Sequence, residues 1–178
     1  SYPGDMFYAH STLLERAGKL AASGKTLTAL PAVVTPGDDI TAYLPTSIMS
    51  ITDGQLIFDL ATFRQNIKPA INAGLSVSRV GGRAQNSRQK KLSGALFKSM
   101  AAYRQAAEFS HFGADMAPET MQALQLGQQL NEAFRQTPGE LFSLTEEELI
   151  LGTVLEAAGR RKLNIGLLKM KVHEMAPN

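Results

Sequence analysis

The chain has 178 residues and 44% of them are hydrophobic, so it can bury a core and holds one large or two small domains. The formal net charge of +2 is too small to predict binding to nucleic acid or to an anionic membrane. Cysteine is absent from the sequence, which excludes disulfides and thiolate metal sites.

The sequence also disfavours a metal site and a membrane-spanning segment. The three histidines, His10, His111 and His173, form no metal-binding pattern on one helix, so we expect no metal site. The longest apolar candidate, residues 149–158, contains Glu156 and is too short to span a membrane. The first residues do not resemble a secretory leader, and we expect the chain to be a piece of a longer one.

The first eighty residues mix helical and strand patterns. Pro3 and Asp5 predict a helix that runs to about Leu20 and is stopped by Gly24. Residues 35–39 predict a turn, Asp53-Gly54 a tight turn between two strands, and residues 61–66 a short helix that ends before Pro69. Strand-like segments are expected at residues 27–34, 48–52, 55–58 and within 71–80.

The remaining chain has helical periodicity. Residues 85–109 form one predicted helix, and its inward face carries Leu92, Leu96, Met100, Tyr103 and Ala107. Gly113 breaks the pattern. A second helix is expected at residues 118–134, and Pro138-Gly139 ends it. A third helix begins at Thr145, with Glu148 completing a capping box, and a fourth covers about 163–172.

One stretch joins the two halves and carries the first candidate site. Residues 74–81, GLSVSRVG, alternate apolar and small polar residues and end in an arginine followed by glycine. An arginine at a strand end is well placed to meet an anion, because its planar guanidinium donates several hydrogen bonds. The alternative is an exposed arginine at a strand-to-helix corner.

A second motif, Ser23-Gly24-Lys25-Thr26, resembles the end of a phosphate-binding P-loop but lacks its spacing. Five residues separate Gly18 from Gly24, where the pattern needs four between its two glycines. The predicted context is also reversed, since a P-loop opens a helix and this segment follows one. We therefore interpret it as a helix end with a polar turn.

A basic run covers Arg79 to Lys98 without an acidic residue. It is compatible with a solvated helix face or with nucleic-acid binding. The first aromatic residue in this run is Phe97, so the run has no stacking platform and the solvated face is favoured.

Several motifs in order resemble the alpha subunit of rotary (F-type) ATP synthases. They are SYPGDMFYAHS at 1–11, LLERA at 13–17, TALP at 28–31, IMSITDGQ at 48–55 and PAINAGLSVSRVG at 69–81. Weaker matches, AAYR at 101–104 and FGAD at 112–115, follow. The resemblance implies an α/β segment, the end of a RecA-like P-loop nucleotide-binding domain (residues 1–82), followed by an all-α helical bundle (83–178).

The family resemblance also implies roles for particular residues. Arg79 matches the arginine finger that alpha donates in trans to the γ-phosphate at the catalytic site on beta, and Ser76 matches a position needed for activity. Ser50 and Gly54 match a phosphate-proximal segment at that interface. Positions near the adenine of alpha's own non-catalytic nucleotide are matched by Phe63, Lys68 and Gln136.

Two departures weaken that second site. The family usually has arginine at the position of Lys68 and a second glutamine at the position of Pro138. The groups that bind phosphate and Mg²⁺ are expected outside this chain, so ATP or ADP with Mg²⁺ belongs to the assembled complex.

The implied function is therefore that of a non-catalytic alpha subunit in a proton-translocating ATP synthase, inactive alone. Its expected partners are beta subunits, the central and peripheral stalks and the remainder of alpha, without nucleic acid. It is expected in the peripheral sector at a mitochondrial, bacterial or plastid membrane, on the matrix, cytoplasmic or stromal side. The alternative is a scaffolding fragment or helical interaction module without a catalytic contribution.

Overall fold

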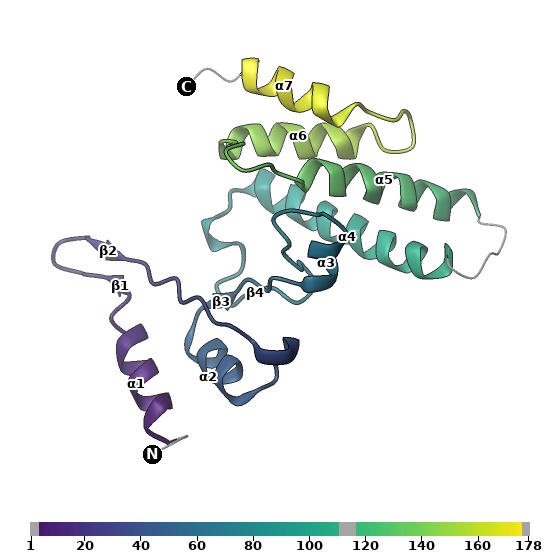
Figure 1. The fold of residues 1–178 in the computed structure, drawn as a ribbon. Coiled ribbons are helices and arrows are strands. Elements are labelled where there is room, and N and C mark those ends of the chain that lie inside the picture. Colours follow the sequence, from purple (N-terminus) through teal and green to yellow (C-terminus); the bar gives the residue numbers. More distant parts are fainter. Residues whose placement is uncertain (1–3, 111–116, 176–178) are drawn as a thin grey trace. The chain divides into compact units, whose positions relative to one another are not determined.

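A computed structural model describes residues 4–110 and 117–175, which divide into two compact units. Unit 1 comprises residues 1–60 and 71–81, and unit 2 comprises residues 61–70 and 82–178. Figure 1 labels the helices and strands and colours them along the sequence. His111, the predicted break at Gly113 and the FGAD motif at 112–115 lie outside the described residues.

Unit 1 combines two helices, a 3₁₀ turn and two antiparallel pairs of very short strands. Strand β1 pairs with β2, and β3 pairs with β4. In chain order, its elements are α1 (Gly4–Leu14), β1 (Gly18–Lys19), β2 (Thr26–Leu27), η1 (Pro36–Asp38), α2 (Tyr43–Ile51), β3 (Gly54–Gln55) and β4 (Val77–Ser78). The predicted turn at 35–39 is confirmed by η1.

The predicted extent of the first helix is wrong. Helix α1 ends at Leu14 because the following residues form a hairpin, in which Gly18 pairs with Leu27 and the Leu20 amide donates to the Lys25 carbonyl at 2.9 Å. The interpretation of Ser23-Gly24-Lys25-Thr26 as a helix end is also wrong, because the motif lies in the turn of this hairpin. Thr26 begins β2 and not a helix, which agrees with the rejection of a P-loop. The predicted strand at 27–34 is also wrong beyond Leu27, since residues 28–34 pair with no described strand.

The predicted strand at 48–52 is replaced by the C-terminal part of α2. Its half-buried residues Leu44, Ile48 and Ile51 recur at helical spacing, and Pro45 lies in the first turn, where a missing amide is tolerated. The tight turn predicted at Asp53-Gly54 therefore joins a helix to β3, and β3 finds its partner in β4.

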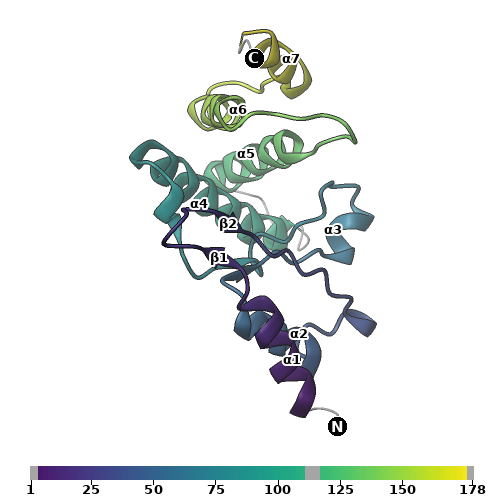
Figure 2. The same cartoon turned by 90° about the vertical axis from the view of Figure 1, so that its left-hand side faces the viewer.

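Unit 2 is almost entirely helical. It contains most of α3 (Leu60–Arg64), the 3₁₀ turn η2 (Gly82–Ala84), and the long helices α4 (Ser87–Ser110), α5 (Pro118–Phe134), α6 (Leu144–Glu156) and α7 (Ile165–Met175). The predicted helices at 61–66, 85–109, 118–134 and 163–172 are confirmed to within a few residues. Figure 2 shows α5, α6 and α7 stacked in chain order, with α4 beside α5.

The core of unit 2 lies between these helices. Leu130, Val154 and Ile165 are fully buried, one each from α5, α6 and α7. Burying an aliphatic side chain contributes about 1.5–3 kcal/mol, so this cluster holds the three helices together. Ala133, Ile150 and Val172 extend it.

The start of α6 differs from the prediction by two residues. Ser143, not Thr145, is the N-cap, and its side chain accepts from the Glu146 amide while Glu146 accepts from the Ser143 amide at 2.6 Å. Both pairs fit the same sequence pattern, since Ser and Thr are equivalent caps, and only the local geometry separates them.

Unit 1, by contrast, has little core. Among its described residues only Pro45 and Ser47 are buried, while Leu30 is 89% exposed and Val34 is 84% exposed. In neither unit is any described helix both long and apolar enough to cross a membrane.

Candidate functional site

Arg79 follows directly after β4 in unit 1, at the strand end where the sequence predicts it. Its backbone amide donates to the Asp53 carbonyl at 2.8 Å, which continues the β3–β4 pairing by one residue. Gly81 then turns the chain with φ of 60°, a value that favours glycine.

The Arg79 guanidinium is exposed and caps a helix. Its Nη1 donates to the Ser50 carbonyl at 2.9 Å and its Nη2 donates to the Met49 carbonyl at 3.0 Å. Both carbonyls belong to the last turn of α2, where the helix dipole favours a cation. A guanidinium carries five N–H donors, so these two bonds orient the group and leave N–H donors for another acceptor.

Gly54 and Ser76 determine how closely β4 approaches. A Cβ at Gly54 would lie 2.6 Å from the Val77 carbonyl oxygen, so only glycine fits there. The Ser76 hydroxyl accepts from the Ile57 amide at 3.0 Å and donates to the Asn72 carbonyl at 2.8 Å. These two residues therefore fix the backbone immediately before Arg79.

Ser50 contributes through its backbone. Its carbonyl accepts from Arg79, while its hydroxyl donates to the Ser47 carbonyl at 2.6 Å, one turn earlier in α2. Unit 1 thus brings together the four positions matched to the catalytic interface: Ser50, Gly54, Ser76 and Arg79.

Unit 2 brings together the other predicted set. The Lys68 Nζ lies 5.4 Å from the centroid of the Phe63 ring, and the backbone N–H of Gln136 donates to the backbone carbonyl of Lys68 at 2.7 Å. Phe63 is 54% exposed, so part of its ring is open to solvent. An exposed aromatic ring beside a cation is a suitable surface for a heteroaromatic base.

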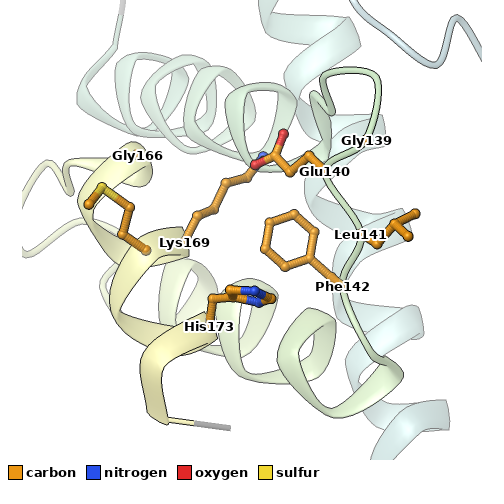
Figure 3. Close-up of a pocket in the computed structure, with 8 residues that line it drawn as sticks. Gly139, Glu140, Leu141, Phe142, Gly166, Lys169 and His173 are labelled. Atoms are coloured by element: carbon orange, nitrogen blue, oxygen red, sulfur yellow. The ribbon is translucent and has the colours of Figure 1, made fainter. Parts of the chain in front are cut away.

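A pocket in unit 2 is lined by residues to which the sequence assigns no binding or catalytic role (Figure 3). The ring of Phe142 lies between two α7 side chains, with Lys169 Nζ 5.4 Å from its centroid and the His173 ring edge-on at 6.3 Å. The i, i+4 spacing of Lys169 and His173 on a helix was the available signal.

The charges of this pocket are already paired within the unit. Lys169 donates to the Arg135 carbonyl and lies 3.6 Å from Glu140, and His173 Nδ1 is 2.8 Å from the Glu146 carboxylate. Hydrogen bonds from Thr137, then the charge of Lys169, lower the pKa of Glu140. We therefore assign these residues to the attachment of α7 and not to ligand binding.

No cluster of three or more metal-ligating side chains occurs in the described parts of the chain. Phe63 and Lys68 fit the base of a nucleotide, and Arg79 fits one anionic group, but the described residues include no set of carboxylates for Mg²⁺.

Two family descriptions match successive parts of the sequence. Residues 1–78 match the nucleotide-binding domain of the ATP synthase alpha/beta family, and residues 85–161 match the C-terminal domain of the ATP synthase alpha/beta chain. The chain belongs to the ATP synthase alpha/beta family. The predicted fold class, the end of the family's nucleotide-binding domain followed by its helical domain, is confirmed.

Curated relatives of this ATP synthase chain are alpha subunits. It is 43% identical over 176 residues to the sodium ion specific ATP synthase subunit alpha of Acetobacterium woodii, covering 95% of this chain and 35% of the relative. It is 44% identical over 177 residues to the ATP synthase subunit alpha of Acholeplasma laidlawii, covering 98% and 35%. The chain thus spans about a third of these relatives, and the predicted resemblance to the alpha subunit is confirmed.

Proposed function

We propose that this chain forms the C-terminal part of a non-catalytic alpha subunit and supplies Arg79 as an arginine finger, in trans, to the catalytic site on a beta subunit. The observation that supports it is the geometry of Arg79, an exposed guanidinium held by two carbonyls at the end of α2. Its family position supports the same role.

The physical basis is charge stabilisation. A transferring phosphoryl group spreads negative charge over its equatorial oxygens. A guanidinium never loses its charge and can meet two oxygens at once. The Met49 and Ser50 carbonyls orient the group in advance, so little side-chain freedom is lost when the phosphate arrives.

Arg79→Ala in the assembled ring is the direct test. We expect ATP hydrolysis to fall by about 10³–10⁵-fold while the ring still forms, because an arginine finger contributes on that scale. Arg79→Lys should restore little of the ATP hydrolysis rate, since the lysine ammonium lacks the planar, two-pronged geometry of a guanidinium. Steady-state turnover and native mass spectrometry of the same preparation measure activity and assembly.

Arg83→Ala is the matched control, because Arg83 is also exposed and lies four residues away. Full turnover with Arg79→Ala would overturn the proposal. It would instead support the second candidate, a scaffolding fragment, for which changes in the helical domain would break assembly and Arg79→Ala would be silent.

The Phe63, Lys68 and Gln136 group extends the proposal to alpha's non-catalytic nucleotide. We propose that Phe63 and Lys68 contact the base of ATP or ADP, and that Gln136 lines the same side. The phosphates and Mg²⁺ of this nucleotide would be held by groups elsewhere in the complex. For Mg²⁺, the described residues include no cluster of three or more metal-ligating side chains.

The remaining parts of the proposal concern the assembly. We propose beta subunits, the stalks and the rest of alpha as partners, in the peripheral sector at the membrane. The proton is the proposed coupling ion, whereas one relative is named sodium ion specific. Sodium dependence of ATP synthesis in reconstituted vesicles separates the two ions.

A further inference from the structure

The solvent face of α4 carries an unusual row of residues at seven-residue spacing. Lys90, Phe97 and Arg104 are all exposed, and Phe97 is exposed to 61%. Residues seven apart lie on one side of a helix, two turns from each other. Phe97 therefore stands between two cations along the helix axis.

A second row of mostly small residues runs beside the first. Gly94 and Ala101 lie three residues before and four residues after Phe97, and both are exposed. A Cβ added at Gly94 would meet nothing within 4 Å, so the space above it is open. Small residues beside an aromatic side chain allow another helix to approach closely and to receive the ring.

The cations on this face and beside it have no carboxylate partner among the described residues. Lys90, Lys98 and Arg104 have no carboxylate within 4.0 Å there, whereas Arg88, near the start of the same helix, lies 3.8 Å from Glu148. Among the described residues of α4, the only acidic one is Glu108, which is exposed and lies one turn after Arg104.

We propose that the α4 face formed by Lys90, Gly94, Phe97, Ala101 and Arg104 is a docking surface for an acidic amphipathic helix. The partner helix would place an apolar pocket over Phe97 and acidic residues about one heptad to either side, opposite Lys90 and Arg104. This inference uses residues of unit 2 alone and is independent of the arginine finger.

The charges of this face disfavour two other partners, a second copy of this chain and nucleic acid. A second copy of this chain would place Lys90 against Lys90 in a parallel pair, or against Arg104 in an antiparallel one, and both arrangements bring like charges together. Nucleic acid would find a single aromatic ring in the row and a carboxylate, Glu108, beside it.

The probe is a fluorescein-labelled peptide about three heptads long, with leucine at the contact positions and glutamate flanking them. Its binding to the full chain is measured by anisotropy at physiological salt. We expect binding that weakens by about tenfold or more in Phe97→Ser, because buried aromatic anchors dominate such interfaces. Phe109→Ser, an equally exposed position of α4, should bind like the unaltered chain.

A second experiment tests the two cations with a pair of double charge-reversal variants. Lys90→Glu with Arg104→Glu should abolish binding of the acidic peptide and permit binding of a peptide with lysine in place of glutamate. Arg160→Glu with Arg161→Glu makes the same change in net charge on the loop after α6 and should have no effect. Circular dichroism of every variant excludes unfolding as the cause.

Several results would overturn the proposal. The first is that the unaltered chain does not bind the peptide. The second is that the two double charge variants lose peptide affinity equally, and the third is that Phe97→Ser binds the peptide as well as the unaltered chain does. Competition by duplex or single-stranded nucleic acid at physiological salt would reassign the face to nucleic acid. Dimerisation in solution that Phe97→Ser abolishes would reassign it to a second copy.

Discussion

Glu146 shows how one side chain can connect three parts of the helical unit. Its carboxylate accepts from the Ser143 amide, contacts His173 of α7, and is itself only 5% exposed. The hydrogen bonds with Ser143 come first among the causes that lower its pKa below the ordinary value of 4.5, and the contact with His173 adds to them.

This lowered pKa predicts a pH dependence of stability. A carboxyl group with a lowered folded-state pKa stabilises the fold above its unfolded value, near 4.5, and loses that contribution as the pH falls through the folded value. We expect Glu146→Gln to be less stable at pH 7 and to lose less stability on acidification. Thermal unfolding measured from pH 7 to about pH 3 tests both.

Glu147→Gln is the control, because Glu147 lies in the same first turn of α6 but is exposed. If both variants lost stability in parallel at every pH, the effect would come from the helix dipole and not from the buried contacts of Glu146.

At the scale of elements, the packing of α4 on α5 depends on one glycine. Gly127 is buried, and a Cβ placed there would lie 2.1 Å from Cγ of Tyr103. We expect Gly127→Ala to lower the free energy of unfolding by about 1–3 kcal/mol, since the two helices must separate or the tyrosine must move. Urea denaturation measures it.

Gly152→Ala is the matched substitution in α6, where a Cβ would meet nothing within 4 Å. This substitution should raise the free energy of unfolding by about 0.5–1 kcal/mol, because alanine has a higher helix propensity than glycine. Equal effects of the two alanines would show that helix propensity, and not the contact with Tyr103, governs Gly127.

The helices of unit 2 were predictable because each buries its own periodic face against a neighbour present in the chain. The strands of unit 1 were predictable only in part. Strand β4 lies within the predicted segment 71–80, whereas the strand predicted at 48–52 is replaced by α2, because a strand needs a partner that the local pattern does not identify. Residues 48–52 are rich in isoleucine and resemble a strand, yet Leu44, Ile48 and Ile51 already had helical spacing. A wider window would have found α2.

The same limit applies to the candidate site. The glycine turn placed Arg79 at a strand end, as the structure has it, but its bonds to Met49 and Ser50 could not be foreseen from residues assigned to a strand. Phe63 and Gln136 are far apart in sequence, and only the family resemblance indicated that they belong together.

For the whole molecule, the two units differ in how well each stabilises itself. Unit 2 has the cluster around Leu130 and Val154, whereas the described part of unit 1 buries only Pro45 and Ser47. Apolar residues such as Leu30 and Val34 are exposed.

Hydrogen exchange of the isolated chain should therefore be uneven. Amides of α5 and α6 should be the most protected, and those of β3, β4 and α2 should exchange much faster, because few buried contacts oppose their opening. In the proposed complex, the protection of unit 1 should rise. Equal protection of both units in the isolated chain would contradict this prediction.

The path of the chain has one more consequence. It crosses between the units at residues 60/61, 70/71 and 81/82, so residues 61–70 belong to unit 2 although unit 1 surrounds them in sequence. Within unit 2, the Gln136–Lys68 hydrogen bond and the buried Ala70 hold this segment. If a specific protease site is inserted between Gly81 and Gly82, the two cleavage fragments should co-elute in native gel filtration and separate only in denaturant.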